Sequence, residues 1–116
     1  MTRLDAGAAV VAASLSLPSD VVADEQVQAG APRTGFLELD ETAERTIGVW
    51  EHTPGVSTDV ESDEVFVVIA GAGTLEFTEP SGLPAVELRP GVVVRLAEGI
   101  RTVWTIRETL RKVYVA

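Results

Sequence analysis

The residues best suited to chemistry are one glutamate and one histidine. Glu64 stands at the start of a dense run of branched and aromatic residues, Val65 to Ala70, so its carboxylate would lie at the lip of an apolar core. His52 is the only histidine of the chain and titrates near neutral pH. Glu64 as general base and His52 as proton shuttle are therefore the candidate catalytic residues.

Both residues also have a structural interpretation, which the sequence leaves open. Glu64 would then be a polar strand end, held by hydrogen bonds or by Arg95 or Arg101. His52 would be a packed, hydrogen-bonded side chain beside Trp50.

Two tryptophans and an acidic turn extend the set. Trp50 and Trp104 either fill the core or face a cavity, where they would stack on a flat or cationic ligand. Asp59 and Glu61 lie close to Glu64 in the chain, so the three carboxylates form either a hard-cation site or a solvated turn.

The densest basic group lies near the C-terminus and consists of Arg107, Arg111 and Lys112. We expect these side chains to be solvated or paired with acidic residues, each exposed pair contributing little. The alternative is that they hold the carboxylate of a ligand.

Composition limits the class of protein. A chain of 116 residues fits one domain, and its net charge of -9 disfavours binding to nucleic acid or anionic membranes. It has no cysteine for a disulfide or thiolate site. The apolar stretch Ala6 to Leu17 is too short to span a bilayer and lacks a clear cleavage site. We predict a cytoplasmic protein in which residues 1–28 form an arm on the barrel or on a partner subunit.

Turn signals every eight to twelve residues or so separate short runs of β-formers from Phe36 onward, and no segment predicts an amphipathic helix. This pattern predicts an all-β antiparallel sandwich or barrel. It places a turn at Gly71-Ala72-Gly73 and a break at Arg107-Glu108-Thr109.

Several of these segments resemble the cupin superfamily. The likeness is greatest to its small single-domain branch, which includes (S)-ureidoglycine aminohydrolase-like and ethanolamine-utilisation cupins. It implies that residues 29–116 form a jelly-roll β-barrel and that the protein is a homodimer. The residues that carry it are Trp50-Glu51-His52-Thr53-Pro54-Gly55, Asp63-Glu64-Val65-Phe66 with Gly71, Gly91, Gly99, Trp104 and Arg111-Lys112-Val113-Tyr114-Val115.

The metal-binding motif of many cupins is incomplete in this chain. Glu64 and Gly71 keep the Glu-x6-Gly spacing of the first motif. Its two histidine positions fall on Thr58 and Val60, or, with a longer spacer, on Ser57 and Asp59.

The second motif has also lost its ligand. Gly91 and Gly99 match it, but Thr102 stands at the histidine position. A transition metal in such a site needs about three or four ligands, mostly imidazoles. We therefore expect no metal and no other cofactor.

The expected interior suits a small, partly apolar molecule. The predicted pocket residues are Trp50, Thr58, Val60, Phe66, Thr102, Trp104 and Tyr114. The main hypothesis is a metal-free, homodimeric cupin that binds a small molecule in the barrel. One alternative is an enzyme of the aminohydrolase or ethanolamine-utilisation type, and another is a structural or regulatory dimer without a ligand.

Overall fold

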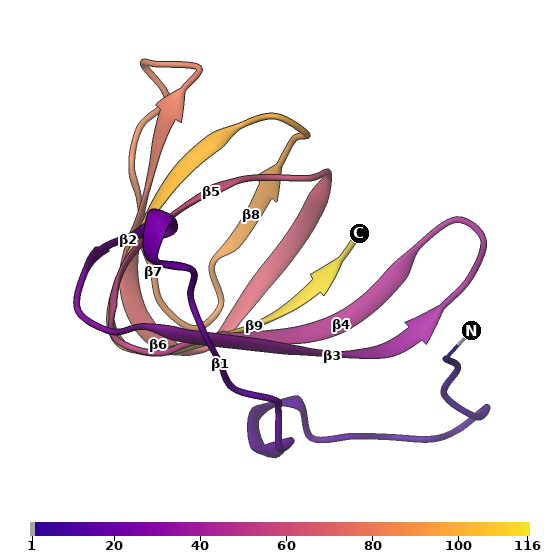
Figure 1. Ribbon diagram of the computed structural model, residues 1–116. Helices are drawn as coiled ribbons and strands as arrows, with labels where there is room; N and C mark the ends of the chain where they lie inside the picture. Colours follow the sequence, from indigo (N-terminus) through magenta and orange to yellow (C-terminus); the bar gives the residue numbers. More distant parts are fainter. Residues whose placement is uncertain (1) are drawn as a thin grey trace.

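Antiparallel sheet makes up most of the chain in the computed structural model, which describes residues 2–116 (Figure 1). The strands are β1 (Asp20–Val21), β2 (Val27–Ala29), β3 (Arg33–Glu41), β4 (Thr46–His52), β5 (Gly55–Val60), β6 (Glu64–Glu79), β7 (Val86–Leu88), β8 (Val93–Leu96) and β9 (Arg101–Val115). The only helical segments among residues 2–116 are the 3-10 turns η1 (Ala12–Ser14) and η2 (Asp24–Gln26), and neither is long and apolar enough to cross a membrane. The all-β antiparallel prediction is confirmed.

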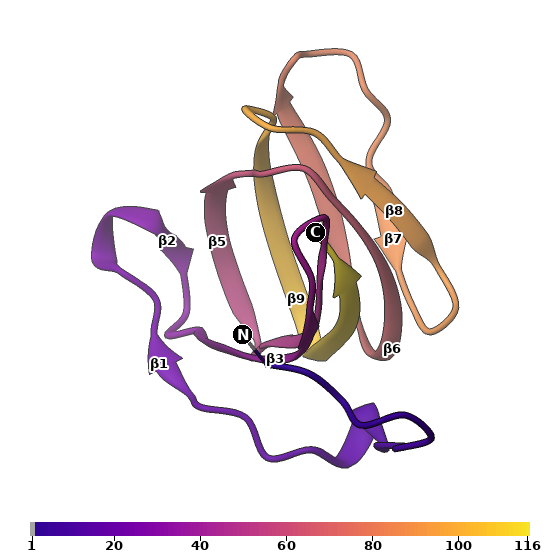
Figure 2. The same cartoon turned by 90° about the vertical axis from the view of Figure 1, so that its right-hand side faces the viewer.

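The sheet curls into a half-barrel around its interior (Figures 1 and 2). The strand order is β1-β3-β4-β9-β5-β2, and β6 extends the sheet by pairing with β7, β8 and β9. The central β9 therefore contacts β4, β5 and β6, and it brings side chains from distant parts of the sequence to one concave face.

Two predicted interruptions are wrong. Gly71-Ala72-Gly73 is not a turn, because β6 runs continuously from Glu64 to Glu79. Arg107-Glu108-Thr109 does not break the last segment, which is the single strand β9. Several register shifts between β6 and β9 bend the pair, and the two strands stay paired on both sides of the bend. The glycines thus mark a bend in a long strand.

The core lies on the concave side, between β6, β8 and β9. Buried residues alternate with more exposed ones along β8 and along parts of β6 and β9, as expected for a sheet with one covered face. The buried cluster consists of Phe66, Val68, Leu75, Leu88, Val94, Leu96, Trp104, Ile106 and Leu110.

The N-terminal arm packs along the convex side of its own sheet and supplies the short strands β1 and β2 (Figure 2). Arg111 donates hydrogen bonds to the carbonyl oxygens of Ala12 and Leu15 at 2.9 and 2.7 Å. Gly35 lies so close to the Pro18 carbonyl that a Cβ atom would overlap it. The division into an arm of residues 1–28 and a barrel of residues 29–116 stays a prediction.

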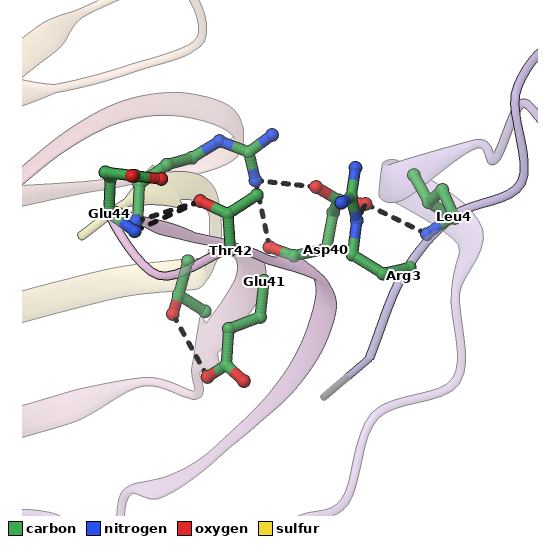
Figure 3. Close-up of polar contacts among 8 residues, drawn as sticks. Arg3, Leu4, Asp40, Glu41, Thr42 and Glu44 are labelled. Carbon is green, nitrogen blue, oxygen red and sulfur yellow. Dashed lines mark hydrogen bonds and ion pairs between the residues drawn. The ribbon is translucent and has the colours of Figure 1, made fainter.

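Asp40 ties the start of the arm to β3 (Figure 3). Its carboxylate accepts hydrogen bonds from Arg3 at 2.8 Å, from the Leu4 amide at 2.9 Å and from Arg45 at 2.6 Å. These donors, Arg3 first, hold the pKa of Asp40 well below its ordinary range. The Asp40 carboxylate therefore stays ionised at neutral pH and holds the start of the arm through Arg3 and Leu4.

Replacing Asp40 with Asn should release the first residues of the arm while leaving the sheet folded. The amide keeps the shape of the side chain but removes the charge that Arg3 and Arg45 bind. We expect faster proteolysis and faster amide hydrogen exchange within residues 2–17. Because the folded pKa of Asp40 is depressed, the wild-type arm should loosen only as the pH falls below about 4. Equal protection in both proteins at pH 7 would contradict this.

Candidate functional site

A pocket of about 410 Å³ opens on the concave face beside Glu64. Three carboxylates, one ammonium group, two indoles, a phenyl ring and a phenol surround it. Its lining residues are Phe36, Trp50, Asp59, Glu61, Ser62, Glu64, Trp104, Lys112 and Tyr114. Strands β3, β4, β5, β6 and β9 and the β5–β6 connection thus supply the walls.

Strand register explains why these residues meet. In antiparallel neighbours, directly opposed residues project from the same face of the sheet. Lys112 of β9 lies opposite Trp50 of β4, and Tyr114 lies opposite Phe66 of β6. Phe36 of β3 lies opposite Trp50 in turn. A continuous row of side chains therefore lines the concave face.

Lys112 and Glu64 form an ion pair at the base of this pocket. Lys112 Nζ donates a hydrogen bond to Glu64 Oε2 at 2.5 Å. The Lys112 side chain is only 5% exposed and the Glu64 side chain 17%. The alternative in which Arg95 or Arg101 holds Glu64 is wrong. Lys112 pairs with an acidic residue, as one of the two expectations for the basic group has it, but the pair is buried and not exposed.

Aromatic rings enclose the ammonium group. Lys112 Nζ lies 4.6, 4.3 and 4.9 Å from the ring centroids of Trp50, Phe66 and Trp104. Cation–π attraction to such rings grows when water is excluded. The tryptophans are 5.2 Å apart between centroids and tilted by 49°. The rings thus stabilise a charge that is costly to bury.

Burial lowers the pKa of Lys112, because the charged form loses hydration. The Glu64 carboxylate opposes this effect most strongly, and Glu61 and Asp59 act in the same direction as Glu64. The charge of Lys112 thus interacts with all three carboxylates of the pocket.

Glu61 is held by two donors from β9. Its Oε2 accepts hydrogen bonds from Thr102 Oγ1 at 2.6 Å and from Trp104 Nε1 at 3.0 Å. Burial raises the pKa of Glu61, with a further contribution from the Asp59 carboxylate, and the two hydrogen bonds oppose the rise. Thr102, which stands at a histidine position of the cupin motif, therefore positions an acid.

His52 lies in a neighbouring pocket of about 240 Å³, which shares Trp50, Trp104 and Asp59 with the first. Its Nδ1 is 2.6 Å from the Thr53 carbonyl oxygen and its Nε2 is 2.8 Å from Ser57 Oγ. A carbonyl only accepts, so Nδ1 carries the proton and Ser57 donates to Nε2. Both ring nitrogens are occupied, which agrees with the packed interpretation, and His52 as a proton shuttle for Glu64 stays a prediction.

Lowering the pH from 7.5 to 5.5 should destabilise the wild-type protein more than a His52→Gln variant. Burial lowers the pKa of His52 below its ordinary value of 6.5. Below about pH 6.5 the imidazole of the unfolded chain therefore binds more protons than that of the folded protein. The stabilisation that neutral His52 gives to the folded state is complete above about pH 6.5 and is lost as the pH falls. Urea unfolding at both pH values checks it. His52 is the only histidine, so an equal loss in both proteins would show that it does not cause the dependence.

Register also decides which residues of β5 face the interior. Ser57 lies opposite Trp104 and Asp59 opposite Thr102, so the longer spacer of the first cupin motif gives the inward positions. Thr58 and Val60 lie opposite Val103 and Arg101 and line a groove of about 380 Å³. Thr58 also borders the His52 pocket, but neither residue lines the pocket beside Glu64. The structure thus differs from the prediction that Thr58 and Val60 share a pocket with Trp104 and Tyr114, because a shift of one residue changes the face.

The residues of the site do not fit the transition metal of many cupins. The former histidine positions hold Ser57, Asp59 and Thr102, and the retained Glu64 pairs with an ammonium group. Within residues 2–116 no three histidine, cysteine, aspartate or glutamate side chains are grouped closely enough to hold a metal ion. The carboxylate-only cation site of Asp59, Glu61 and Glu64 therefore finds no support.

The sequence pattern located part of this site. Trp50, Glu64, Trp104 and Tyr114 line the main pocket, while Phe66 packs beneath its rings at 5.7 Å from Trp104. The sequence pattern did not identify Phe36 or Lys112 as pocket residues, and it did not show that the Glu61 side chain faces the pocket. Lys112 stands two residues before Tyr114 in one strand, so the alternation that placed Tyr114 inside also predicts an inward Lys112.

A curled antiparallel sheet with a side-chain-lined interior and a retained glutamate at its lip defines a small cupin-type domain. The sequence profile of the EutQ-like cupin domain matches residues 39–114, and the chain belongs to this family. A comparison with curated proteins gives no match. The predicted relationship to ethanolamine-utilisation cupins is confirmed at the level of this family.

Solved structures with the same fold are only distantly similar in sequence. A protein of unknown function from Pseudomonas syringae pv. tomato is 22% identical over 88% of this chain and 44% of its own, with a TM-score of 0.71. EutQ from Clostridium difficile is 18% identical over 72% of this chain and 61% of its own, with a TM-score of 0.59. A structure from the work on the DMSP lyases RdDddP and RnDddQII is 15% identical over 71% of this chain and 46% of its own, with a TM-score of 0.60. The chain thus spans about half the length of these proteins.

Proposed function

We propose that this protein binds a small molecule in the Glu64–Lys112 pocket without a transition metal. The observation that carries the proposal is the ion pair at 2.5 Å, because the glutamate that most metal-binding cupins use as a ligand already has a counter-ion. The pocket of about 410 Å³ is within the range of small-molecule sites, and it combines aromatic walls with a few convergent polar groups. A ligand-free structural role would suit a filled interior better.

Elemental analysis of protein purified without an affinity tag tests the metal-free part. We expect manganese, iron, nickel and zinc well below one equivalent, and one equivalent of any of them would overturn it.

Ligand binding can be followed by the intrinsic tryptophan fluorescence, since both tryptophans of the chain line the pocket. Titrating panels of small amines, carboxylic acids and carbonyl compounds should change the tryptophan emission in the wild type. A Trp50→Phe variant keeps an aromatic wall and should report the same ligands through Trp104.

A small-molecule enzyme is the second candidate, and the acid–base pair itself favours it. Glu64 is a carboxylate beside a proton donor in a pocket with aromatic walls, an arrangement that suits proton transfer. Here Glu64→Gln should remove turnover, with the circular dichroism spectrum unchanged. Full turnover in that variant would exclude Glu64 from the mechanism. The aminohydrolase and ethanolamine-utilisation relatives suggest the first substrates to try.

We also propose a homodimer, because apolar side chains lie exposed on the convex face. Val93 and Val67 are opposed across β8 and β6, and Val65 and Val115 across β6 and β9. Val93 is 64% exposed. Light scattering on the wild type should give twice the monomer mass. Val93→Glu should shift it to the monomer if this face is the interface, and the mass of a monomer for the wild type would refute the proposal.

A further inference from the structure

Lys112 is the only lysine of the chain, and the other eight of its nine basic residues are arginine. The one amine side chain is thus the one buried in the pocket. For a purely structural ion pair among aromatic rings, arginine would serve at least as well, because its guanidinium pairs with carboxylates in a bidentate manner and stacks on rings. A lysine differs in one respect that matters for chemistry: its nitrogen loses a proton and becomes a nucleophile.

We propose that Lys112 captures a small aldehyde or ketone as a Schiff base, with Glu64 as the group that moves the protons. Lys112 lines a cavity with room for a small molecule, and the proton acceptor of its Nζ lies 2.5 Å away. Trp50, Phe66 and Trp104 keep water from the nitrogen. The inference rests on the proposed function, since it concerns the same metal-free pocket and names the class of molecule that it binds.

Glu64 and Lys112 together supply every proton that the reaction needs. Glu64 accepts a proton from the ammonium group, and the nitrogen lone pair attacks the carbonyl carbon while the π electrons move to oxygen. That oxygen takes the proton from Glu64, and the nitrogen returns one, giving a neutral carbinolamine. Glu64 then protonates the hydroxyl group, which leaves as water while the C=N bond forms. The sum is ammonium plus carbonyl to protonated imine plus water, without an oxidant or reductant.

The pocket also limits the carbonyl compound. The carboxylates of Asp59, Glu61 and Glu64 disfavour an anionic ligand, because like charges repel at short range. The rings of Phe36, Trp50 and Trp104 favour an apolar chain. A neutral, short aliphatic aldehyde or ketone therefore fits better than a keto acid. Burial lowers the pKa of Lys112, which agrees with a nitrogen that loses its proton more readily than an exposed lysine.

Reductive trapping tests the proposal on the wild-type protein. Butanal and sodium cyanoborohydride are added at pH 6.5, and peptide mapping by mass spectrometry follows alkylation of Lys112 with time. The matched control is the same protein unfolded in urea, where Lys112 reacts as an ordinary amine. We expect the folded protein to react clearly faster, because Glu64 takes the proton of the ammonium group directly beside the cavity. The rate should saturate with butanal. Glu64→Gln should slow it, and Glu64→Asp should retain part of it.

Two results would overturn the proposal. Lys112 that is modified in urea but not in the folded protein is a structural counter-ion only. Lys112 that reacts equally fast in both states is accessible but not activated. Neither result would contradict the proposed binding of a small molecule without a metal, which elemental analysis and tryptophan titration test separately. Selective, saturable modification of folded Lys112 that depends on Glu64 would support both.

Discussion

Replacing Lys112 with Met should lower the free energy of unfolding by about 3 kcal/mol, the low end of the range for breaking a buried ion pair by removing one partner. Methionine keeps much of the aliphatic stem that packs between Trp50 and Phe66, so most of the loss is electrostatic. Glu64 would be left largely buried without its counter-ion. Urea unfolding at pH 7 measures the change, and a loss below about 1 kcal/mol would mean that the pair contributes no more than an exposed one.

A double-mutant cycle separates the ion pair from packing. Glu64→Gln removes the other charge, and the variant with both changes buries no unpaired charge at this point. We expect the double variant to be clearly more stable than the sum of the two single losses predicts, with a coupling of about 1 to 3 kcal/mol for side chains in contact. Strict additivity would show that Lys112 acts through packing alone.

Replacing Gly71 with Ala should destabilise the protein by about 3 kcal/mol, the second large effect. Gly71 has a φ of +92°, which costs other residues roughly 1 to 2 kcal/mol. A Cβ atom there would also overlap the Thr109 carbonyl and contact the Leu110 Cα atom of β9. The final glycine of the Glu-x6-Gly spacing is thus required by the close approach of β6 and β9 at the bend.

Gly82→Ala is the matched control for that prediction. Gly82 has nearly the same backbone angle, a φ of +91°, but no atom lies within 4 Å of the position of an added Cβ. Its loss should be about 1 to 2 kcal/mol, from backbone strain alone. The difference between the two variants in urea unfolding measures the steric contact. Equal losses would show that strain explains both.

Much of the fold is readable from local pattern. Alternation along Thr46–His52 predicts Trp50 and His52 on one face of that strand, and alternation along Arg101–Ile106 predicts Trp104 and Ile106 on one face of the other, because side chains alternate across a strand whatever its partners. The glycines at positions 71 and 73 predict a turn, but a turn and a bend in a long strand both favour glycine. Only the pairing of β6 with β9 over its whole length distinguishes the two.

For the site, local pattern found single residues but not their partners. Glu64 was located at the lip of the core, yet its counter-ion lies 48 positions further along the chain. Local spacing does not pair two residues so far apart in the chain, because the choice of partner depends on which strands are neighbours. The inward residues of β5 were ambiguous for the same reason, and the pairing of Ser57 with Trp104 resolved them.

The sequence by itself determined an all-β domain, an acidic surface and an incomplete set of metal ligands, because these follow from local periodicity, charge and residue identity. Only the tertiary structure decided that the lone lysine meets the retained glutamate, with two tryptophans and a phenylalanine around its ammonium group. An ion pair between strands distant in sequence depends on register, and register is a property of the folded sheet as a whole.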